Sequence, residues 1–469
     1  MNSNARKPVA VIGAGIAGLT AAHFLRRNGI PVILFEGGKQ IAGMASSFVD
    51  DRGFHYDFGA HFITNRLAAA VGIGGQCRDV PYYGESFLVG GKTYSYPFGL
   101  MANPRFVASG LKAKLFSRGA MRSPPGAHGP NALDWFRSEF GAALADEVSL
   151  PILEAWSGVP ADQLAASVGE KLQNSILKTI YLRLCSRLHG RAISMGYSHE
   201  MPENPNVWHV YPERGVSQVC ERILADVHDV VEMESPVEKI LVEDGRVVAV
   251  QVAGVEREVS AVVSTVPAPF LPKLIHGSNA LEPLTRFRYR AMAFACLRFE
   301  KRGILSDTVL WTAGAGFPFF RLTETPLSMP WLAPAGKTLI TADIGCQAGD
   351  DVWKMDDAAL GERCVDAMAE LFPGVRRHYS GCRVLRTPIA YPVYLAEYET
   401  DRRAFARDTG VEGLYSIGRN GEFAHILMED IYWRTIKKMN ELIGRLPQMP
   451  DEVRAARPSY AAIQPVNAS

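Results

Sequence analysis

Residues 8 to 36 constrain the fold of this chain more than any other stretch of it. A short apolar run from Pro8 to Ile12 leads into the glycine-rich turn Gly13-Ala14-Gly15-Ile16-Ala17-Gly18. Apolar residues then recur at helical spacing, and a second apolar run from Pro31 to Phe35 ends in Glu36. This order of strand, glycine turn, helix, strand and acid predicts a βαβ unit that holds the ADP part of a dinucleotide.

Each glycine of the turn has a predicted role. Gly13 permits the tight turn, Gly15 lets the backbone approach a pyrophosphate, and Gly18 lets the helix pack closely on the strand. The helix N-terminus offers free N–H groups and a positive dipole end to the phosphates. Glu36 is expected to accept hydrogen bonds from ribose hydroxyls. The other residues of the turn that are predicted to contact the nucleotide are Ala14, Ile16 and Ala17.

The composition of the 469 residues, 47% hydrophobic and 21% charged, is ordinary for a soluble globular enzyme. A formal net charge of +1 argues against wholesale nucleic-acid binding. The seven cysteines have no C-x-x-C spacing, so neither a metal site nor a disulfide framework is indicated, and reduced thiols in a cytoplasmic protein are expected. No apolar stretch reaches about 18 residues, so no spanning helix is predicted. The polar N-terminus leaves no room for a cleavable signal before the first strand.

Two later segments favour FAD over NAD. The stretch from Ile41 to Ser47 brings a glycine soon after the acid, and Gly413 to Phe423 predicts a strand followed by a glycine turn. With the N-terminal motif they resemble the flavoprotein superfamily of amine oxidases, protoporphyrinogen oxidase, phytoene desaturases and UDP-galactopyranose mutase. In that superfamily the first segment runs along FAD, which implies contacts from Gly43, Met44 and Ala45. The family usually has two glycines where this chain has Ala42-Gly43.

A returning segment is also implied by the resemblance. Strand-like runs between residues 231 and 266 resemble the stretch of the family in which the backbone of Val237 would meet the adenine. An ordinary hairpin is the alternative interpretation.

The C-terminal turn departs from the oxidases of the family, which usually carry a Gly-Asp pair there. This chain has Gly418-Arg419, followed by Phe423, and resembles the galactopyranose mutase branch. A helix is expected from about Ile426 to Leu446. Arg419 is a candidate to neutralise a reduced flavin anion or a substrate phosphate; the alternative is a surface arginine at a turn.

A second candidate group lies between residues 53 and 62. The run Gly59-Ala60-His61-Phe62 resembles the Asp-x-Gly-x-His stretch that lies against the isoalloxazine ring in the family. His61 is therefore a candidate to hydrogen-bond the ring or to move a proton. The alternative is a satisfied histidine of the core.

The predicted fold class is α/β: a discontinuous Rossmann-like FAD-binding domain with an inserted substrate domain of helices and an antiparallel sheet. The predicted FAD-binding stretches are 1–95, 205–290 and 396–450, the substrate-domain stretches are 96–204, which is helical, and 291–395, and the tail is 451–469. Tyr391, Tyr394 and Tyr398 are candidate substrate contacts, with a packed aromatic strand as an equal alternative. The basic, partly apolar stretch Lys112 to Arg118 fits a membrane surface, an anionic substrate or a solvated helix face.

The leading hypothesis is an FAD-dependent oxidoreductase that takes hydride from a small organic substrate onto flavin N5, with His61 as proton partner and Arg419 beside the flavin. The alternative is a nucleotide-sugar mutase that uses FAD without net redox, and a third is a non-catalytic flavin-bound scaffold. No residue lies in a recognisable flavin-linkage motif, so FAD is expected to bind non-covalently. No second G-x-G-x-x-G motif is present, so no NAD(P)H domain is predicted. Neither the substrate nor the oligomeric state follows from the sequence.

Overall fold

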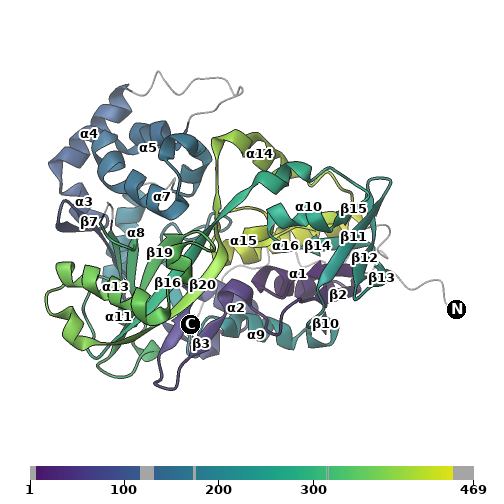
Figure 1. Ribbon diagram of the computed structural model, residues 1–469, viewed down its shortest axis with the longest axis horizontal. Coiled ribbons are helices and arrows are strands. Elements are labelled where there is room, and N and C mark those ends of the chain that lie inside the picture. The colour runs from purple at the N-terminus through teal and green to yellow at the C-terminus, as the bar shows by residue number, and fades with distance from the viewer. Residues whose placement is uncertain (1–6, 117–130, 173–175, 313, 315, 447–469) are drawn as a thin grey trace.

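The structure is a computed structural model, and it describes residues 7–116, 131–172, 176–312, 314 and 316–446. Two sheets lie side by side, each accompanied by helices (Figure 1). The predicted α/β class is confirmed, with a parallel sheet in one part of the molecule and a largely antiparallel sheet in the other.

The parallel sheet has five strands in the order β10-β2-β1-β14-β21, and every neighbouring pair is parallel. Its strands are β1 (Val9–Ile12), β2 (Val32–Phe35), β10 (Val231–Glu232), β14 (Ala261–Ser264) and β21 (Leu414–Ser416). They come from three separate stretches of the chain. The strands β1 and β14 are buried along their whole length, as expected where a parallel sheet is covered on both faces. We call this sheet and its helices the nucleotide lobe.

Two helices from opposite ends of the sequence pack together in the nucleotide lobe. Helix α1 (Ile16–Arg27) joins β1 to β2 and contacts α16 (Met428–Arg445). Leu19 and Leu25 of α1 and Met439 of α16 belong to one hydrophobic cluster. The C-terminal helix therefore lies close to its predicted position. The other helices of this lobe include α2 (Asn65–Val71), α9 (Ser217–Ala225), α10 (Leu271–Leu274) and α15 (Gly418–Gly421).

Three smaller sheets complete the nucleotide lobe. The first has the order β13-β12-β11-β15 and contains β11 (Val237–Glu243), β12 (Arg246–Val252), β13 (Val255–Glu258) and β15 (Ile275–His276). The other two contain β3 (Ser47–Val49) with β4 (His55–Asp57), and β5 (Ile63–Thr64) and β6 (Cys77–Asp79) on either side of β9 (His209–Pro212).

The second lobe, which we call the substrate lobe, is built on a seven-stranded sheet in the order β20-β16-β19-β18-β17-β7-β8. Its strands are β7 (Glu85–Val89), β8 (Lys92–Ser95), β16 (Arg288–Phe299), β17 (Val309–Thr312), β18 (Arg321–Glu324), β19 (Thr338–Cys346) and β20 (Tyr379–Val393). Because β7 and β8 belong here, the chain enters this lobe at residue 85 and not after residue 95, where the first domain stretch was predicted to end.

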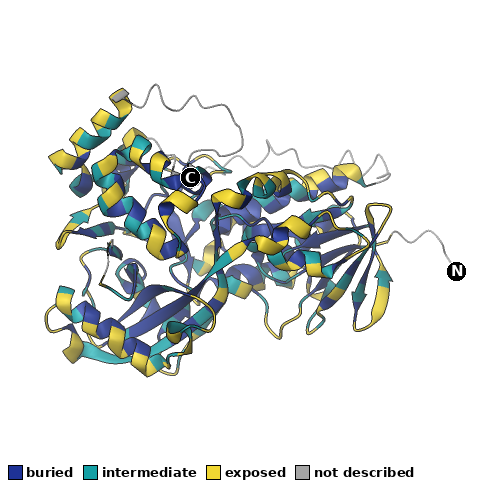
Figure 2. Cartoon of the chain, turned by 45° about the horizontal axis from the view of Figure 1, so that its top comes forward, coloured by how far each residue is buried: buried dark blue, intermediate teal, exposed yellow. Residues whose placement is uncertain are grey.

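The central strand β16 explains how this sheet is buried on both faces. Ala293 and Leu297 pack in a cluster with α13 (Asp357–Leu371), whereas Phe294 and Cys296 belong to the cluster shared with the nucleotide lobe. Figure 2 shows the resulting blue interior of the sheets and the yellow outer faces of the helices. The two-residue period of a strand thus aims Phe294 at the space between the lobes.

Helices cap one end of the substrate lobe. They include α3 (Phe98–Met101), α4 (Pro104–Phe116), α5 (Ala132–Phe140), α6 (Ala142–Leu144), α7 (Leu150–Ser157) and α8 (Ile176–His189). Later helices are α11 (Thr325–Ser328), α12 (Asp351–Lys354) and α14 (Glu399–Arg407). The predicted basic stretch runs through the end of α4, and its last two residues, Ser117 and Arg118, lie outside the described residues, as does the predicted tail. No helix in the described ranges is long and apolar enough to cross a membrane.

Candidate active site

The three glycines of the N-terminal turn meet three different surroundings. Gly13 has a φ of 97°, and a Cβ there would lie 2.1 Å from the hydroxyl oxygen of Thr265. A Cβ on Gly18 would lie 1.8 Å from the carbonyl oxygen of Gly13. Gly15 is different, since its φ of −75° and ψ of 178° suit any residue and no atom lies within 4 Å of its Cβ position. The protein itself requires glycine at positions 13 and 18, whereas at position 15 it leaves open space at the start of α1.

Glu36 lies at the carboxyl end of β2, beside this turn. Its carboxylate accepts hydrogen bonds from the backbone N–H groups of Ala14 and Gly38, both at 2.7 Å. The backbone carbonyl of Glu36 accepts from the N–H of Ser235 at 2.8 Å. This bond brings the start of β11, at Val237, close to the acid, as the returning segment of a nucleotide site requires. The adenine contact of Val237 itself stays a prediction.

The segment after the acid crosses the glycine turn. The N–H of Ala42 donates to the carbonyl of Ala14 at 2.9 Å, and Ala42 has a φ of 77°. This left-handed conformation favours glycine, which gives a physical reason for the glycine that related proteins usually carry there. Gly43 follows with a φ of 53° and open space at its Cβ position. Met44 is half-buried and Ala45 is buried.

The C-terminal turn packs directly on the first turn of α1. A Cβ on Gly418 would lie 2.8 Å from the Cβ of Ala17, and Gly418 has a φ of 77°. The N–H of Ile417 donates to the carbonyl of Ser264 at 2.9 Å, which fixes this turn at the carboxyl edge of the parallel sheet. The two glycine turns, separated by about 400 residues of sequence, therefore lie together.

His61 and Arg419 form the centre of the candidate site. The ring Nε2 of His61 lies 3.0 Å from the carbonyl oxygen of Phe58. A carbonyl only accepts, so Nε2 carries the hydrogen and Nδ1 keeps its lone pair. Burial lowers the pKa of His61, as do the charges of Arg419 and Arg321, while Asp57 acts in the opposite direction. His61 is therefore neutral at pH 7 and able to accept a proton.

Arg419 is held against an aromatic side chain. Its guanidinium lies over the ring of Tyr391 at 4.7 Å, and burial lowers its pKa. Its Nε is buried and, among the described residues, has no hydrogen-bond partner. An unpaired buried N–H costs roughly 1–3 kcal/mol. Arg419 as a whole is half-buried, so part of its side chain is accessible to a ligand group near His61.

A further arginine, which no sequence motif indicated, lies at the same place. Arg321 of β18 pairs with Asp343 of β19, which is fully buried. Its Nη2 lies 3.6 Å from the Cβ position of Gly59, and its guanidinium lies over the ring of Trp311. The buried Nε atoms of Arg321 and Trp311 also have no hydrogen-bond partner within the described structure. Only the pairing of strands from the substrate lobe brings these donors to Gly59 and His61, so local spacing could not have revealed them.

The three candidate tyrosines have different surroundings in the structure. Tyr391 faces Arg419. The hydroxyl of Tyr394 accepts from the N–H of His425 at 2.9 Å, and the hydroxyl of the fully buried Tyr398 donates to the carbonyl of Val393. Tyr398 is thus a core residue, which corrects its prediction as a substrate contact, and Tyr391 is the candidate that the geometry supports.

Two residues predicted to bind the cofactor have no accessible surface. Phe423 adopts a φ of 50° and packs with ring centroids 4.7 Å from Phe287 and 5.1 Å from Tyr289. Ala14 is fully buried, and its N–H is bonded to Glu36. A fully buried side chain can touch no ligand in this conformation, so both residues pack inside the protein next to the two glycine turns. The other predicted residues surround the two turns and His61: Ile16, Ala17, Ala60 and Phe62.

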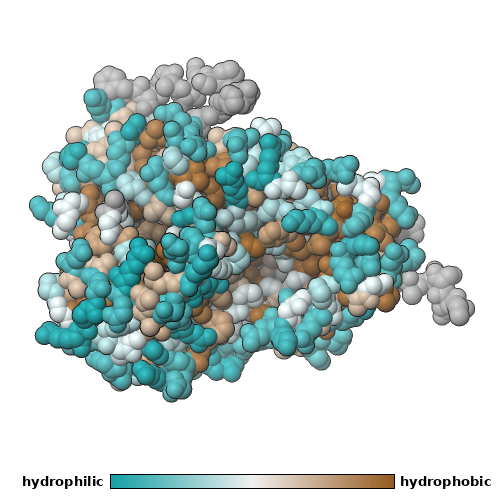
Figure 3. Space-filling view, in the orientation of Figure 1, coloured by the Kyte–Doolittle hydropathy of each residue, from teal (hydrophilic) through white to brown (hydrophobic). Residues whose placement is uncertain are grey.

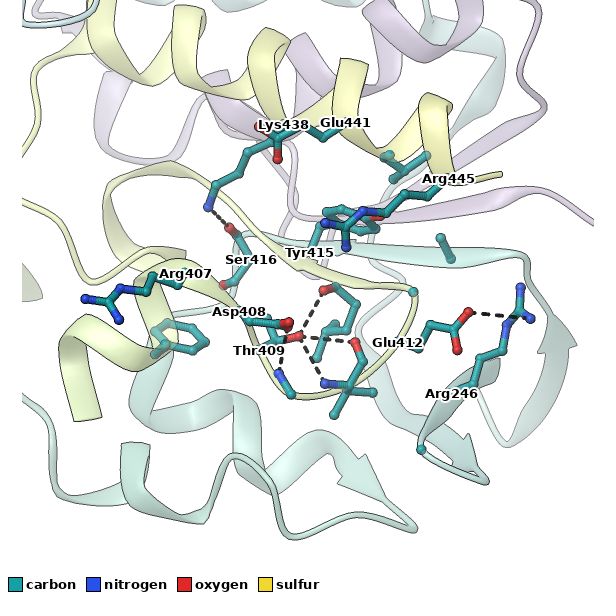
Figure 4. Close-up of a pocket in the computed structure, with 18 of the residues that line it drawn as sticks. Arg246, Arg407, Asp408, Thr409, Glu412, Tyr415, Ser416, Lys438, Glu441 and Arg445 are labelled. Atoms are coloured by element: carbon teal, nitrogen blue, oxygen red, sulfur yellow. Dashed lines mark hydrogen bonds and ion pairs between the residues drawn. The ribbon is translucent and has the colours of Figure 1, made fainter. Parts of the chain in front are cut away.

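A surface cavity of about 440 Å³ lies apart from these residues, beside β21 and α16 (Figure 4). Some of its charged side chains have partners: Lys438 donates to the carbonyl of Ser416 at 2.8 Å, and Arg246 pairs with Glu412 at 3.7 Å. The hydroxyl of Thr409 is bonded within its own loop. None of the catalytic or cofactor candidates lines this cavity, so we assign it no part in the site.

Comparison with known proteins agrees with this arrangement. The family model for flavin-containing amine oxidoreductases matches residues 16–430. Coproporphyrinogen III oxidase of Staphylococcus aureus is 23% identical over 384 residues, which cover 74% of this chain and 79% of that protein. Hydroxysqualene dehydroxylase of Sinorhizobium fredii is 34% identical over 99 residues, 20% of this chain and 21% of that protein. An inactive all-trans-retinol 13,14-reductase of Danio rerio is 44% identical over 55 residues, which span 12% of this chain and 9% of that protein.

Solved structures share the fold at low sequence identity. Reduced UDP-galactopyranose mutase superposes with a TM-score of 0.73 at 16% identity, covering 97% of this chain and 98% of that one. Cyclohexylamine oxidase from Brevibacterium oxydans IH-35A gives a TM-score of 0.70 at 15% identity, and the match covers 95% of this chain and 100% of that one. These likenesses establish the fold and leave the substrate undetermined.

Proposed function

Because the chain belongs to the family of flavin-containing amine oxidoreductases and is thus an FAD-dependent oxidoreductase, we propose that it oxidises a small organic substrate at a non-covalently bound FAD. The observation that carries this proposal is the open space at Gly15. The fold tolerates a side chain at that position, so the glycine serves a group outside the protein, such as a pyrophosphate at the start of α1.

The residues around this space fit the parts of FAD. The N–H groups at the start of α1 would face the pyrophosphate, Glu36 the ribose, and the backbone near Val237 the adenine. The segment Gly43 to Ala45 would run along the cofactor toward Gly59 and His61. When bound, FAD supplies the redox chemistry by accepting a hydride at N5.

The side chains of this protein supply binding, charge and a proton acceptor. Neutral His61 keeps the Nδ1 lone pair for a proton released from the substrate. Arg419 and Arg321 place two cations beside His61, which favours negative charge on the reduced cofactor or on the substrate. Both arginines are half-buried, so the accessible part of each side chain can make this contact. Tyr391 orients the guanidinium of Arg419.

A nucleotide-sugar mutase without net redox is the second candidate. The observation that favours it is the pair of arginines beside His61, since two buried cations suit a diphosphate as well as a carboxylate. The Gly418-Arg419 turn, which resembles the mutase branch, supports the same alternative.

An anaerobic experiment separates the two candidates. If the protein is an oxidoreductase, a substrate bleaches the yellow protein without added reductant, and the absorbance returns with an acceptor. If it is a mutase, oxidised protein is inert, and conversion of a nucleotide sugar begins only after chemical reduction of the flavin. A flavin that stays with acid-precipitated protein would contradict non-covalent binding.

Two variants test the assigned roles. His61→Ala should lower kcat more than it raises KM, if the imidazole accepts the proton. Arg419→Ala should lower the flavin reduction potential, because removing a charge-assisted contact costs about 1.5–3 kcal/mol. Arg419→Lys keeps the charge and should recover part of the potential, and exposed His276→Ala is the control for His61. If both variants keep the wild-type turnover and potential, neither residue acts at the flavin.

A further inference from the structure

Helix α8 exposes an apolar stripe that nothing else in the described structure covers. Leu177, Tyr181, Leu184 and Leu188 recur at spacings of four and three residues, so they share one face of the helix. Leu177 keeps 74% of its surface exposed, and Leu188 keeps 83%. Contiguous exposed apolar residues of this kind usually mark an interaction surface.

The inward face of α8 holds it to the protein with few apolar contacts. Leu182 and Cys185 pack with Ile193 in a small cluster separate from the main cores. The helix therefore exposes more large apolar side chains than it buries, and the exposed stripe adds nothing to the stability of the free protein.

A second stripe lies on α4, and α3 connects it to α8. Val107, Leu111 and Leu115 recur every four residues, with Leu111 62% and Leu115 73% exposed. Arg187 of α8 lies over the ring of Phe98 in α3, and α3 packs on α4. Figure 3 shows brown, hydrophobic surface on the left of the molecule, where Figure 1 places α3 and α4. We call these two rows of side chains the apolar stripes.

The charge of the two helices has one sign. Together α4 and α8 contain six lysines and arginines and no acidic residue, within a chain whose net charge is only +1. Arg105 and Lys114 pair with Glu147 and Glu139 of neighbouring elements. Arg183 is buried, whereas Lys112, Lys178 and Arg187 are exposed positive charges beside the apolar stripes, which favours a partner that is both apolar and anionic.

We propose that the apolar stripes of α8 and α4 dock this protein on an anionic lipid bilayer. A helix of 14 residues is about 21 Å long, which is too short to span the hydrocarbon core of about 30 Å, so α8 would lie in the plane of the headgroups. Leucines would enter the acyl boundary, and the exposed side chains of Lys112, Lys178 and Arg187 would reach the headgroup phosphates. A second copy is the poorer occupant, because a two-fold contact would oppose two helices of like charge.

The inner face of α8 lies close to the candidate active site. Arg183 donates to the carbonyl of Tyr83, and the ring of Tyr83 lies 4.9 Å from that of Phe62, the neighbour of His61. Docking would therefore place the bilayer next to the residues that approach the site from the substrate lobe. The docking surface does not depend on the proposed reaction, and either can fail without the other.

Vesicle flotation with the full-length, flavin-loaded protein tests the proposal. Wild-type protein should float with vesicles of phosphatidylcholine containing about one third phosphatidylglycerol, and its binding should weaken as the salt concentration rises. The double variant Leu177→Asp/Leu188→Asp, and separately Leu111→Asp, should reduce binding by roughly tenfold or more. Val255→Asp is the matched control, since Val255 is 60% exposed on β13, in the other lobe. Flavin content and thermal unfolding verify that each variant is folded.

Four outcomes would overturn the proposal. Wild-type protein could stay unbound on these vesicles, or bind equally well to phosphatidylcholine alone. The Val255→Asp control could lose as much binding as the stripe variants. Size-exclusion chromatography could instead reveal a dimer that Leu177→Asp/Leu188→Asp dissociates, which would assign the stripes to a second copy of the chain. Retention of flavin and of anaerobic bleaching in all these cases would leave the proposed function intact.

Discussion

The two lobes of this protein contribute to the candidate site in different ways. The nucleotide lobe contributes closely packed backbone. It has two glycines at which a Cβ would clash with neighbouring protein atoms, one glycine that leaves open space, and one acid at a strand end. The substrate lobe uses side chains that meet only after long strands have paired, such as Arg321 and Asp343. Backbone sites depend on a few consecutive residues, whereas side-chain sites depend on the register of a whole sheet. The first kind is visible in a sequence motif, and the second is not.

The largest expected effect is a difference between two glycines of the nucleotide lobe, one needed for folding and one needed for binding the flavin. Gly18→Ala puts a Cβ 1.8 Å from the carbonyl oxygen of Gly13 and should prevent folding, so we expect insoluble protein. The Cβ of Gly15→Val meets no protein atom within 4 Å, so this variant should fold, but purify without flavin. The ratio of flavin absorbance to soluble protein measures both results. A yellow, fully loaded Gly15→Val protein would mean that the open space at position 15 is not the pyrophosphate site.

The next effect concerns the buried ion pair of the substrate lobe. Asp343→Asn leaves Arg321 without its counter-charge, and removing one partner of a buried pair typically costs about 3–5 kcal/mol of unfolding free energy. Urea unfolding measures this loss. Glu213→Gln breaks the exposed pair with Arg78 and should change the stability by about 1 kcal/mol or less. Equal, small losses in both variants would mean that solvent reaches Arg321 readily, and the contrast between the lobes would weaken.

A third effect concerns pH and the buried His209 of β9. Burial lowers the pKa of His209 from 6.5 to about 4. As the pH falls from 6.5 to 4, this histidine is therefore protonated in the unfolded chain before it is protonated in the folded protein. The free energy of unfolding falls by up to about 3 kcal/mol over this range. Unfolding by urea at several pH values should show a shallower acid limb for His209→Gln than for the wild type. The exposed His276→Gln variant should keep the wild-type slope, and a slope unchanged by His209→Gln would contradict the assignment.

The smallest effect lies at Ala42. A left-handed φ of 77° destabilises the folded protein by roughly 1–2 kcal/mol when the residue is alanine, and glycine removes this strain. Glycine also raises the entropy of the unfolded chain, which offsets about 0.5–1 kcal/mol of the gain. Ala42→Gly should therefore stabilise the protein by up to about 1 kcal/mol, seen as a small rise in Tm. Ala45→Gly, three residues on and outside the left-handed region, should lower Tm instead. A fall in Tm of equal size for both variants would show that the conformation of Ala42 carries no strain.

Much of the nucleotide lobe could be predicted because its signals are local. The first βαβ unit, the crossing segment at Gly43 and the C-terminal turn with its helix were all expected near where they lie. Phe423 and Tyr398 show the limit of such prediction. Both lie in motifs or runs that resemble functional segments, yet their side chains point into the aromatic core under the C-terminal turn. Sequence position located the segments, but the direction of each side chain depended on packing from other elements.

By itself, the sequence determined the βαβ unit, its glycines and acid, and the family to which the chain belongs, because each rests on a short run of residues with fixed backbone requirements. Only the tertiary structure decided which groups meet at His61. Arg419 comes from the C-terminal turn, Arg321 from β18 and Tyr391 from β20, and no spacing along the chain relates them. Tertiary structure also left α8 with an apolar face that no other described residue covers, since whether an amphipathic helix finds a cover depends on the shape of the rest of the molecule.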